Sequence, residues 1–194
     1  IEDIAAKKLP INILLNRRGN VVSDIGASLL TAAGASEENI KSWGGSVTYA
    51  ASKEQGELMR DRRADAILNS LFVGHRSISQ LASAIDLALI PVGKETAEKV
   101  MKEWTIGAFT IPSDAYAWAP NATDTVTVSA QLFVRADADP KMVTDLTAAL
   151  LDNADKVAGV HKAMSALDTK LMASATAAPY HPAAEAVYKA KGLR

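Results

Sequence analysis

The chain has no cysteine among its 194 residues. This absence excludes a disulfide framework, a thiolate zinc site and a cysteine nucleophile. A surplus of charge is lacking as well, because the formal net charge is only -1. No basic field is therefore available to neutralise a run of phosphates, and general nucleic-acid binding is not expected.

Long apolar runs are also missing. Stretches such as Leu87–Val92 are far shorter than the roughly 20 residues that a membrane-spanning helix needs. The hydrophobic content of 48% is nevertheless enough to form a core in one full domain or two small lobes. Because the chain starts at Ile1 without Met or a charged-then-apolar leader, we expect a processed or truncated product.

Strand-like and helix-like patterns alternate through the first half of the chain. Short apolar runs bounded by turn residues predict strands, and apolar residues spaced by three and four predict helices. This alternation is typical of an α/β fold with a central, mostly parallel sheet and helices on both faces. The predicted strands cover 11–15, 39–43, 64–69 and 86–92, and the predicted helices cover 22–33, 49–61, 77–85 and 94–104.

The second half has a different pattern. Residues 108–118 combine turn residues with aromatics, and 125–134 have strong strand propensity. Helices are predicted from Pro140 through Leu151, more weakly over 160–172, and again over 183–191, with a loop at 174–178. We therefore expect one crossing strand followed by a helical carboxy-terminal segment.

Several short patterns follow one another along the chain: Arg18–Asn20, Leu29–Gly34, Ser42–Gly45, Arg63–Ile67, Val73–His75, Thr110–Pro112 with Tyr116, Thr125–Val128, and His181–Ala184 with Tyr188 and Gly192. In this order they resemble the second half of solute receptors of the TRAP transporter TAXI family. Each pattern alone is generic, so the resemblance depends on their order and on the His-Pro segment near the carboxy terminus. The sequence departs from the family at Arg62-Arg63 and Ala183, where glycine is common, and at Arg76, where proline is common.

The resemblance implies a type II periplasmic-binding-protein fold, in which two lobes close on a solute held in the cleft between them. Residues 1–118 would form the second ligand-binding lobe, and 119–194 would form the crossover strand and helices that return to a preceding first lobe. Half of the ligand site would then lie in that first lobe. The implied function is that of a periplasmic or extracytoplasmic receptor, without a cofactor, that delivers a small anionic solute, an amino acid or organic acid, to TRAP membrane subunits.

The turn after the first predicted strand is the main candidate for solute contact. Arg17, Arg18, Gly19 and Asn20 stand before a predicted helix, and Ser23 lies in its first turn. Guanidinium groups and the backbone N–H groups at a helix start both bind carboxylate or phosphate. The alternative is a solvated turn in which the arginines only add solubility.

Other candidates are an aromatic wall and the end of a strand. The segment Trp43–Gly45 places an aromatic face beside an unencumbered backbone, although it is equally well explained as a buried Trp and a turn. Asn69 and His75 flank the end of a predicted parallel strand, where open α/β sheets bind ligands, and Tyr116 could line the cleft or pack the crossover. The full set of expected solute-binding residues is Arg17, Arg18, Gly19, Asn20, Ser23, Trp43, Gly44, Gly45, Asn69, His75 and Tyr116.

Catalytic motifs are not found in the sequence. It has no Gly-x-Ser-x-Gly elbow, no Walker loop and no paired carboxylates on one helix, and His161 and His181 lack metal-ligand spacing. A non-enzymatic binding protein without a metal site is therefore expected. Because fold alone does not fix function, an effector-sensing domain of a transcription regulator and an enzyme on the same fold remain alternatives.

Overall fold

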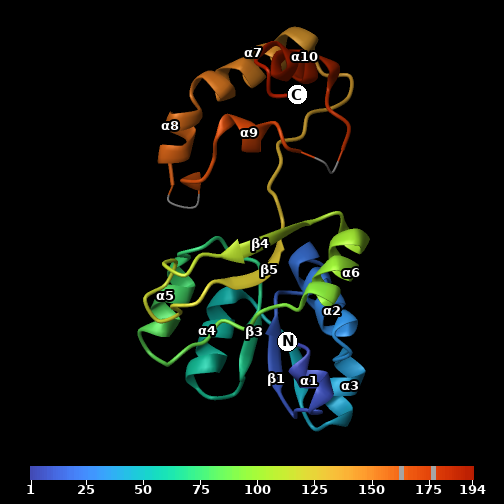
Figure 1. Cartoon of the computed structure of the whole chain (residues 1–194), viewed down its shortest axis with the longest axis vertical. Coiled ribbons are helices and arrows are strands. Elements are labelled where there is room, and N and C mark those ends of the chain that lie inside the picture. The colour runs from blue at the N-terminus through green and yellow to red at the C-terminus, as the bar shows by residue number, and fades with distance from the viewer. Residues whose placement is uncertain (162–163, 176–177) are drawn as a thin grey trace. The chain divides into compact units, whose positions relative to one another are not determined.

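The computed structural model describes residues 1–161, 164–175 and 178–194 (Figure 1). The chain forms two compact units, Ile1–Val128 and Ser129–Arg194, and we describe each by itself. Both sheets belong to the first unit. The functional division expected after Trp118 stays a prediction.

The first unit contains a three-stranded parallel sheet, which confirms the expected α/β fold. Its strands are β1 (Asn12–Leu15), β2 (Ser46–Tyr49) and β3 (Ala66–Leu68), in the order β2-β1-β3. In this register Leu15 pairs with Tyr49 on one side and Leu68 on the other. The central strand is an almost uninterrupted apolar run because both of its faces are covered.

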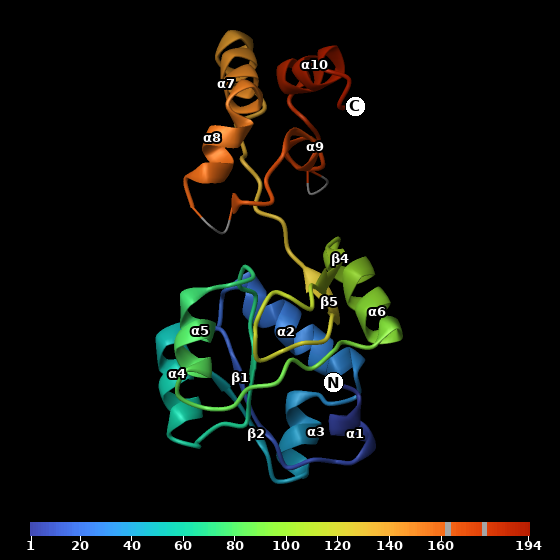
Figure 2. The same ribbon diagram turned by 60° about the vertical axis from the view of Figure 1, so that its left-hand side comes forward.

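Helices cover both faces of this sheet (Figures 1 and 2). The chain leaves β1 toward β2 on one side and then returns past β1 to β3 on the other. Right-handed crossovers in these two directions place the connecting helices on opposite faces. These helices are α2 (Val21–Ala32) and α3 (Glu37–Ser42) on one face, with α4 (Ser52–Arg60) and α5 (Arg76–Ala82) on the other; α1 (Asp3–Ala6) precedes β1.

Helix α2 is held in place from two sides. Toward the sheet, Ile13 and Leu15 form a core cluster with Leu30, and Gly26 allows close packing because a Cβ there would lie 2.9 Å from the Leu15 side chain. Toward α6 (Lys94–Trp104), α2 buries Ile25 and Leu29 against Val100 and its neighbours. This double packing fixes the position of the amino-terminal end of α2.

An antiparallel pair completes the first unit. Strand β4 (Gly107–Ile111) follows α6 and pairs with β5 (Thr123–Thr127). The start of α6 is capped by Glu2, whose carboxylate accepts hydrogen bonds from Gly93 N (3.0 Å) and Thr96 Oγ1 (2.6 Å). Burial alone raises the pKa of Glu2, but these and neighbouring hydrogen bonds outweigh it and lower the pKa to about 2.

Three strand predictions were wrong in whole or in part. Residues 39–43 lie mostly in α3, which begins after Ser36, whose hydroxyl accepts a hydrogen bond from Asn39 N (3.2 Å). Ser36 followed by two glutamates is a helix-start signal that overrides the apolar residues of the short run. Residues 86–92 form no strand, and 125–134 are strand only through Thr127.

The second unit is helical, as expected. It contains α7 (Pro140–Asp152), α8 (Ala154–Gly159), α9 (Thr169–Met172) and α10 (Pro182–Ala190), and α7 packs against α10. Asp139 caps α7 through Met142 N (2.8 Å), with Pro140 at the first helical position. The helices predicted from Pro140 and over 183–191 are confirmed. The expectations for 160–172 and 174–178 lie partly on residues 162–163 and 176–177, outside the described residues.

Candidate functional site

The strand order of the parallel sheet marks one of its edges as a ligand-binding position. In an open α/β sheet of order 2-1-3, ligands bind outside the carboxyl ends of the strands, where the strand order reverses beside β1 and β3. Asn16–Asn20 follow β1, Tyr49 ends β2 and Asn69 follows β3. We call these residues the carboxyl edge.

Two asparagines connect the ends of β1 and β3. Asn16 Nδ2 donates to Asn69 Oδ1 (3.2 Å), and Asn16 Oδ1 accepts a hydrogen bond from Arg17 N (2.7 Å). Asn69 Nδ2 in turn donates to Ser52 Oγ (3.2 Å) and to Gln55 Oε1 (2.9 Å) of α4. The Asn69 amide is therefore bonded within the protein on both of its ends, and it fixes the start of the Arg17–Asn20 turn.

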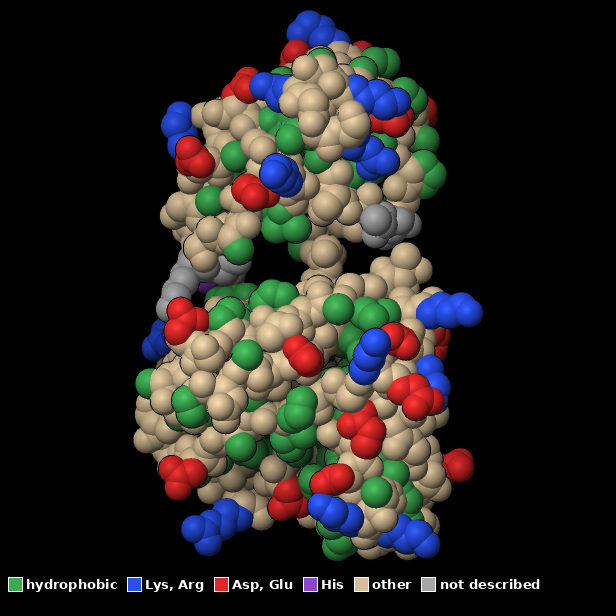
Figure 3. All heavy atoms as spheres, viewed as in Figure 1, with side chains coloured by type: hydrophobic (Ala, Val, Ile, Leu, Met, Phe, Trp, Pro, Cys, Tyr) green, Lys and Arg blue, Asp and Glu red, His purple; other side chains and the backbone are tan. Residues whose placement is uncertain are grey.

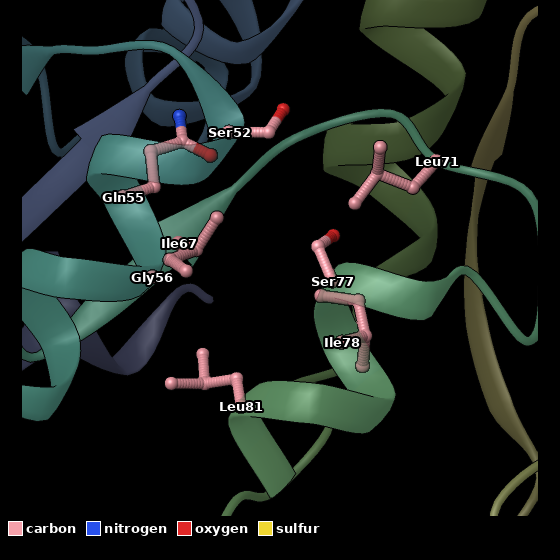
Figure 4. Close-up of a pocket in the computed structure, with 8 residues that line it drawn as sticks. All are labelled: Ser52, Gln55, Gly56, Ile67, Leu71, Ser77, Ile78 and Leu81. Carbon is pink, nitrogen blue, oxygen red and sulfur yellow. The ribbon is translucent and has the colours of Figure 1, made fainter.

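A small cavity lies beside this network, between α4, β3 and α5 (Figure 4). Its volume is about 10 Å³, which admits about one water molecule and no solute. Ser52 and Gln55 line it and also bond Asn69, so the cavity belongs to the support of the edge. The lining residues are Ser52, Gln55, Gly56, Ile67, Leu71, Ser77, Ile78 and Leu81.

The turn after β1 leads into a capped helix. Gly19 has a φ of +80°, a value that favours glycine, and Asn20 Oδ1 caps α2 by accepting from Val22 N (2.9 Å). Ser23 is 0% exposed, and its hydroxyl donates to Asn20 O (2.7 Å). This burial corrects the expectation that Ser23 faces the cleft with the arginines, because its hydroxyl stabilises the turn from beneath.

Arg18 lies against an aromatic ring and a carboxylate. Its guanidinium carbon is 3.7 Å from the centre of the Tyr49 ring, and its Nη2 is 3.5 Å from each carboxylate oxygen of Glu37. Tyr49 Oη donates to Glu37 Oε2 (3.2 Å), so the three side chains contact one another in pairs. Burial raises the pKa of the Tyr49 phenol, and the charge and hydrogen bond of Glu37 raise it further.

Arg17 points its charge to solvent. Its side chain is exposed, and within the part of the chain that the structure describes its guanidinium makes no hydrogen bond or ion pair. Arg17 and Arg18 thus bring two positive charges to the end of β1, beside the positive end of the α2 dipole. On the face shown in Figure 3, cationic and anionic side chains are interspersed among the described residues of each unit, without a broad patch of one sign.

The structure does not bring Trp43, Gly44 and Gly45 to the carboxyl edge. They precede β2, so the length of that strand, about 13 Å, separates Gly45 from Tyr49. A Cβ at Gly45 would lie 2.3 Å from Ile11 O, and Trp43 packs against the core cluster of β1. The expected common cleft with Arg18 therefore does not form, because β2 starts after Gly45, whereas the predicted strand would end at Trp43.

His75 lies in the loop after β3 and starts α5. Its Nδ1 accepts a hydrogen bond from Ser77 N (3.2 Å) and lies 2.7 Å from Ser77 Oγ, while its ring packs edge-on against Phe72 at 4.8 Å between centres. These contacts give His75 a capping role at the helix. His75 is half-buried and lies on the side of the sheet where β3 ends.

Tyr116 supports the same loop. Its hydroxyl accepts a hydrogen bond from Gly74 N (2.9 Å), and its ring stacks on Trp118 with 4.9 Å between centres. A groove of about 290 Å³ runs beside this aromatic pair and α5. The groove carries no charged lining residue, in contrast to the carboxyl edge. Its lining residues are Ser79, Ala82, Ser83, Ala115, Tyr116, Ala117 and Trp118.

Sequence reasoning missed Asn16, Glu37 and Tyr49. Tyr49 was assigned to the start of a helix, whereas it is the last residue of β2 and pairs with Leu15. Glu37 follows the Ser36 cap, and that cap signal was the clue to its position at the start of a helix. Asn16 is a lone turn residue, and no pattern in the sequence shows that it bonds Asn69.

Comparison with known proteins supports the fold and assigns the family. Residues 8–192 match the model of the NMT1-like family. The chain belongs to this family. The NMT1-like family is part of the periplasmic-binding-protein-like superfamily, and its members are generally binding proteins and typically extracytoplasmic. No curated protein sequence gave a match.

Across 1–161, 164–175 and 178–194, no helix combines the length and apolar character needed to cross a membrane. Over the same ranges, no group of three or more His, Asp or Glu side chains is placed to hold a metal ion.

Proposed function

We propose that this chain is a ligand-binding lobe of an extracytoplasmic receptor of the TRAP transporter TAXI type, which captures a small anionic solute and delivers it to TRAP membrane subunits. The family assignment supports a solute receptor of the periplasmic-binding-protein type. The TAXI assignment is supported by the resemblance of the ordered sequence patterns. The proposal that the solute is anionic rests on the position of Arg17 and Arg18 at the carboxyl end of the central strand.

The chemistry of the carboxyl edge suits a carboxylate. A guanidinium group offers paired N–H donors that match the two oxygens of a carboxylate, and the amino-terminal end of α2 adds a favourable dipole. The hydrogen bond from Arg17 N to Asn16 fixes the turn from which both arginines project. An amino acid or an organic acid therefore fits this edge better than a neutral solute, whereas the uncharged groove beside Tyr116 offers no counter-ion.

Replacement of Arg18 by Ala tests this proposal in the intact receptor. We expect the variant to bind an anionic solute more weakly by about 1.5–3 kcal/mol, since it loses a charged hydrogen bond. Calorimetry measures the dissociation constant, and Arg60→Ala is the matched control because Arg60 is also an exposed arginine but ends α4. An unchanged dissociation constant in a folded Arg18→Ala protein would remove Arg18 from the site.

We also propose that residues 129–134, at the start of the second unit, serve as the crossover to another lobe of the receptor. Leu132 is 70% exposed and Phe133 is 63% exposed, although 125–134 have strong strand propensity. When adjacent apolar side chains are exposed on a segment with strand propensity, the segment is suited to pair as a strand with the sheet of another lobe. A neighbouring lobe of the same receptor is the partner that the TAXI resemblance implies.

This second proposal predicts that the chain of 194 residues self-associates through the segment or leaves it poorly protected. Light scattering should show concentration-dependent association, or hydrogen exchange should show rapid exchange around Leu132. Replacing both Leu132 and Phe133 by Ser should reduce any association, whereas Val160→Ser, which also removes an exposed apolar side chain, should not. A strict monomer with full protection from Ser129 onward would contradict the proposal.

A further inference from the structure

Glu37 contributes a carboxylate to the contact between Arg18 and Tyr49, and it has no role in the function proposed so far. It lies in the first turn of α3, and both of its oxygens are 3.5 Å from Arg18 Nη2. The Tyr49 hydroxyl donates to the same carboxylate. Glu37 therefore presents to Arg18 the chemical group that the proposed solute would present.

The contact between Glu37 and Arg18 is suited to being exchanged. Charge-assisted N–H···O bonds are usually about 2.7–2.9 Å long, so a separation of 3.5 Å marks a loose pair. The side chains of Arg18 and Glu37 are 67% and 50% exposed, which leaves both open to a competing ion. The pair is thus held in place without being buried.

Glu37 also has a stable position without Arg18. A carboxylate in the first turn of a helix is favoured by the helix dipole, and Ser36 already caps α3 through Asn39 N. Release of Arg18 therefore does not leave the Glu37 charge unsupported. Meanwhile the ring of Tyr49 keeps the Arg18 guanidinium beside the end of β1.

We propose that Glu37 is a resident anion of the carboxyl edge: it pairs with Arg18 when no solute is bound, and the anionic group of the solute displaces it. This inference rests on the proposed function, because it takes Arg18 as a solute ligand. Glu37 then acts through Arg18 as a positioning residue. It holds the guanidinium in place and lowers the affinity for every anion that must displace it.

The test is calorimetric titration of the intact receptor and its variants with glutamate, succinate and inorganic phosphate. Glu37→Gln should lower the dissociation constant of a bound anion about two- to fivefold, the range set by an exposed ion pair. Glu38→Gln is the matched control, because it removes an exposed charge from the same helical turn and should have no effect. In an Arg18→Ala background, Glu37→Gln should also have no effect, since the residue acts through Arg18.

A second readout reports the contact without any solute. Glu37→Gln removes the charge that raises the pKa of Tyr49, so the phenol should titrate at lower pH in the variant. Ultraviolet titration can follow this change, with Tyr49→Phe used to subtract the other tyrosines. An unchanged Tyr49 titration would show that Glu37 does not contact this edge in solution and would overturn the inference.

The outcomes separate this inference from the proposed function. If Arg18→Ala weakens anion binding but Glu37→Gln leaves it unchanged or weaker, the receptor function stands and the role of Glu37 is overturned. If Glu37→Gln tightens binding equally with and without Arg18, or if Glu38→Gln also tightens it, a general charge effect explains the result and the role of Glu37 is overturned. If Arg18→Ala binds all three anions as the wild type does, or if none binds to the wild type, the proposed function itself fails.

Discussion

The amino and carboxyl ends of the same parallel sheet use similar polar side chains in different ways. At the amino end, Asp65 accepts hydrogen bonds from Asn12 N (2.8 Å) and Asn12 Nδ2 (3.0 Å), and Ser46 Oγ donates to Asn12 Oδ1 (2.8 Å). These contacts join the starts of all three strands. At the carboxyl end, an asparagine pair also bridges two strands, but Arg17 and Arg18 project beyond it toward solvent. The amino end thus ties the starts of three strands together through side-chain hydrogen bonds, whereas at the carboxyl end two strands are bridged and Arg17 and Arg18 extend from the turn that follows β1.

Two glycines show the same contrast. A Cβ at Gly45, at the amino end of the sheet, would collide with Ile11 O at 2.3 Å. Gly19, at the carboxyl end, has a φ of +80° and open space around the position of its missing Cβ. Glycine is needed for close packing at the first site and for backbone conformation at the second. The amino edge is therefore closely packed at Gly45, whereas the turn at Gly19 is open, as the proposed solute site requires.

The largest expected effect on stability follows from Gly45→Ala. The added methyl group has to displace the backbone of Ile11, and we expect the free energy of unfolding to fall by about 1–3 kcal/mol. Urea denaturation measures this change. Gly56→Ala is the control, because Gly56 lies inside α4 with no atom near its missing Cβ, and it should stabilise the protein by about 0.5–1 kcal/mol. A fully stable Gly45→Ala protein that loses solute affinity would instead return Gly45 to the ligand site.

A smaller effect is expected from Asp65→Ala. The change removes the carboxylate that accepts two hydrogen bonds from Asn12, and we expect a loss of about 1–2 kcal/mol in unfolding free energy. Solute affinity should stay within error of the wild type, since Asp65 lies at the opposite edge from Arg18. Asp61→Ala removes another exposed aspartate, at the end of α4, and should change neither quantity. A marked loss of affinity in Asp65→Ala would break the separation between the two edges.

Much of the fold follows from local patterns. The apolar spacing in α2 and α6 and the proline at the start of α7 were sufficient to predict those helices, and the strand-helix alternation predicted the parallel sheet. The strand predicted over 39–43 was wrong because Ser36 and the two following glutamates start a helix there, and Ile40 of this helix packs against the core cluster of β1. The strand predicted over 86–92 was wrong as well. This segment is irregular, and in it only Val92 N donates a hydrogen bond to a strand residue, Asp124 O of β5.

The candidate site was predictable only in part. Arg17 and Arg18 could be recognised because they follow a clear strand and precede a clear helix. Tyr49 reaches Arg18 because β2 covers Ser46–Tyr49 and pairs Tyr49 with Leu15, whereas the sequence pattern placed the second strand at 39–43, so this error hid Tyr49. The same error placed Trp43 beside Arg18.

The most direct test of a solute site at the carboxyl edge is an NMR titration of the intact receptor with succinate, read residue by residue. We expect the largest backbone amide shifts at Arg17–Asn20, with further shifts at Tyr49 and Asn69. The amides of Trp43–Ser46 at the amino edge should stay in place. Saturable shifts confined to Trp43–Ser46, or to the uncharged groove at Tyr116 and Trp118, with none at Arg17–Asn20, would contradict the account.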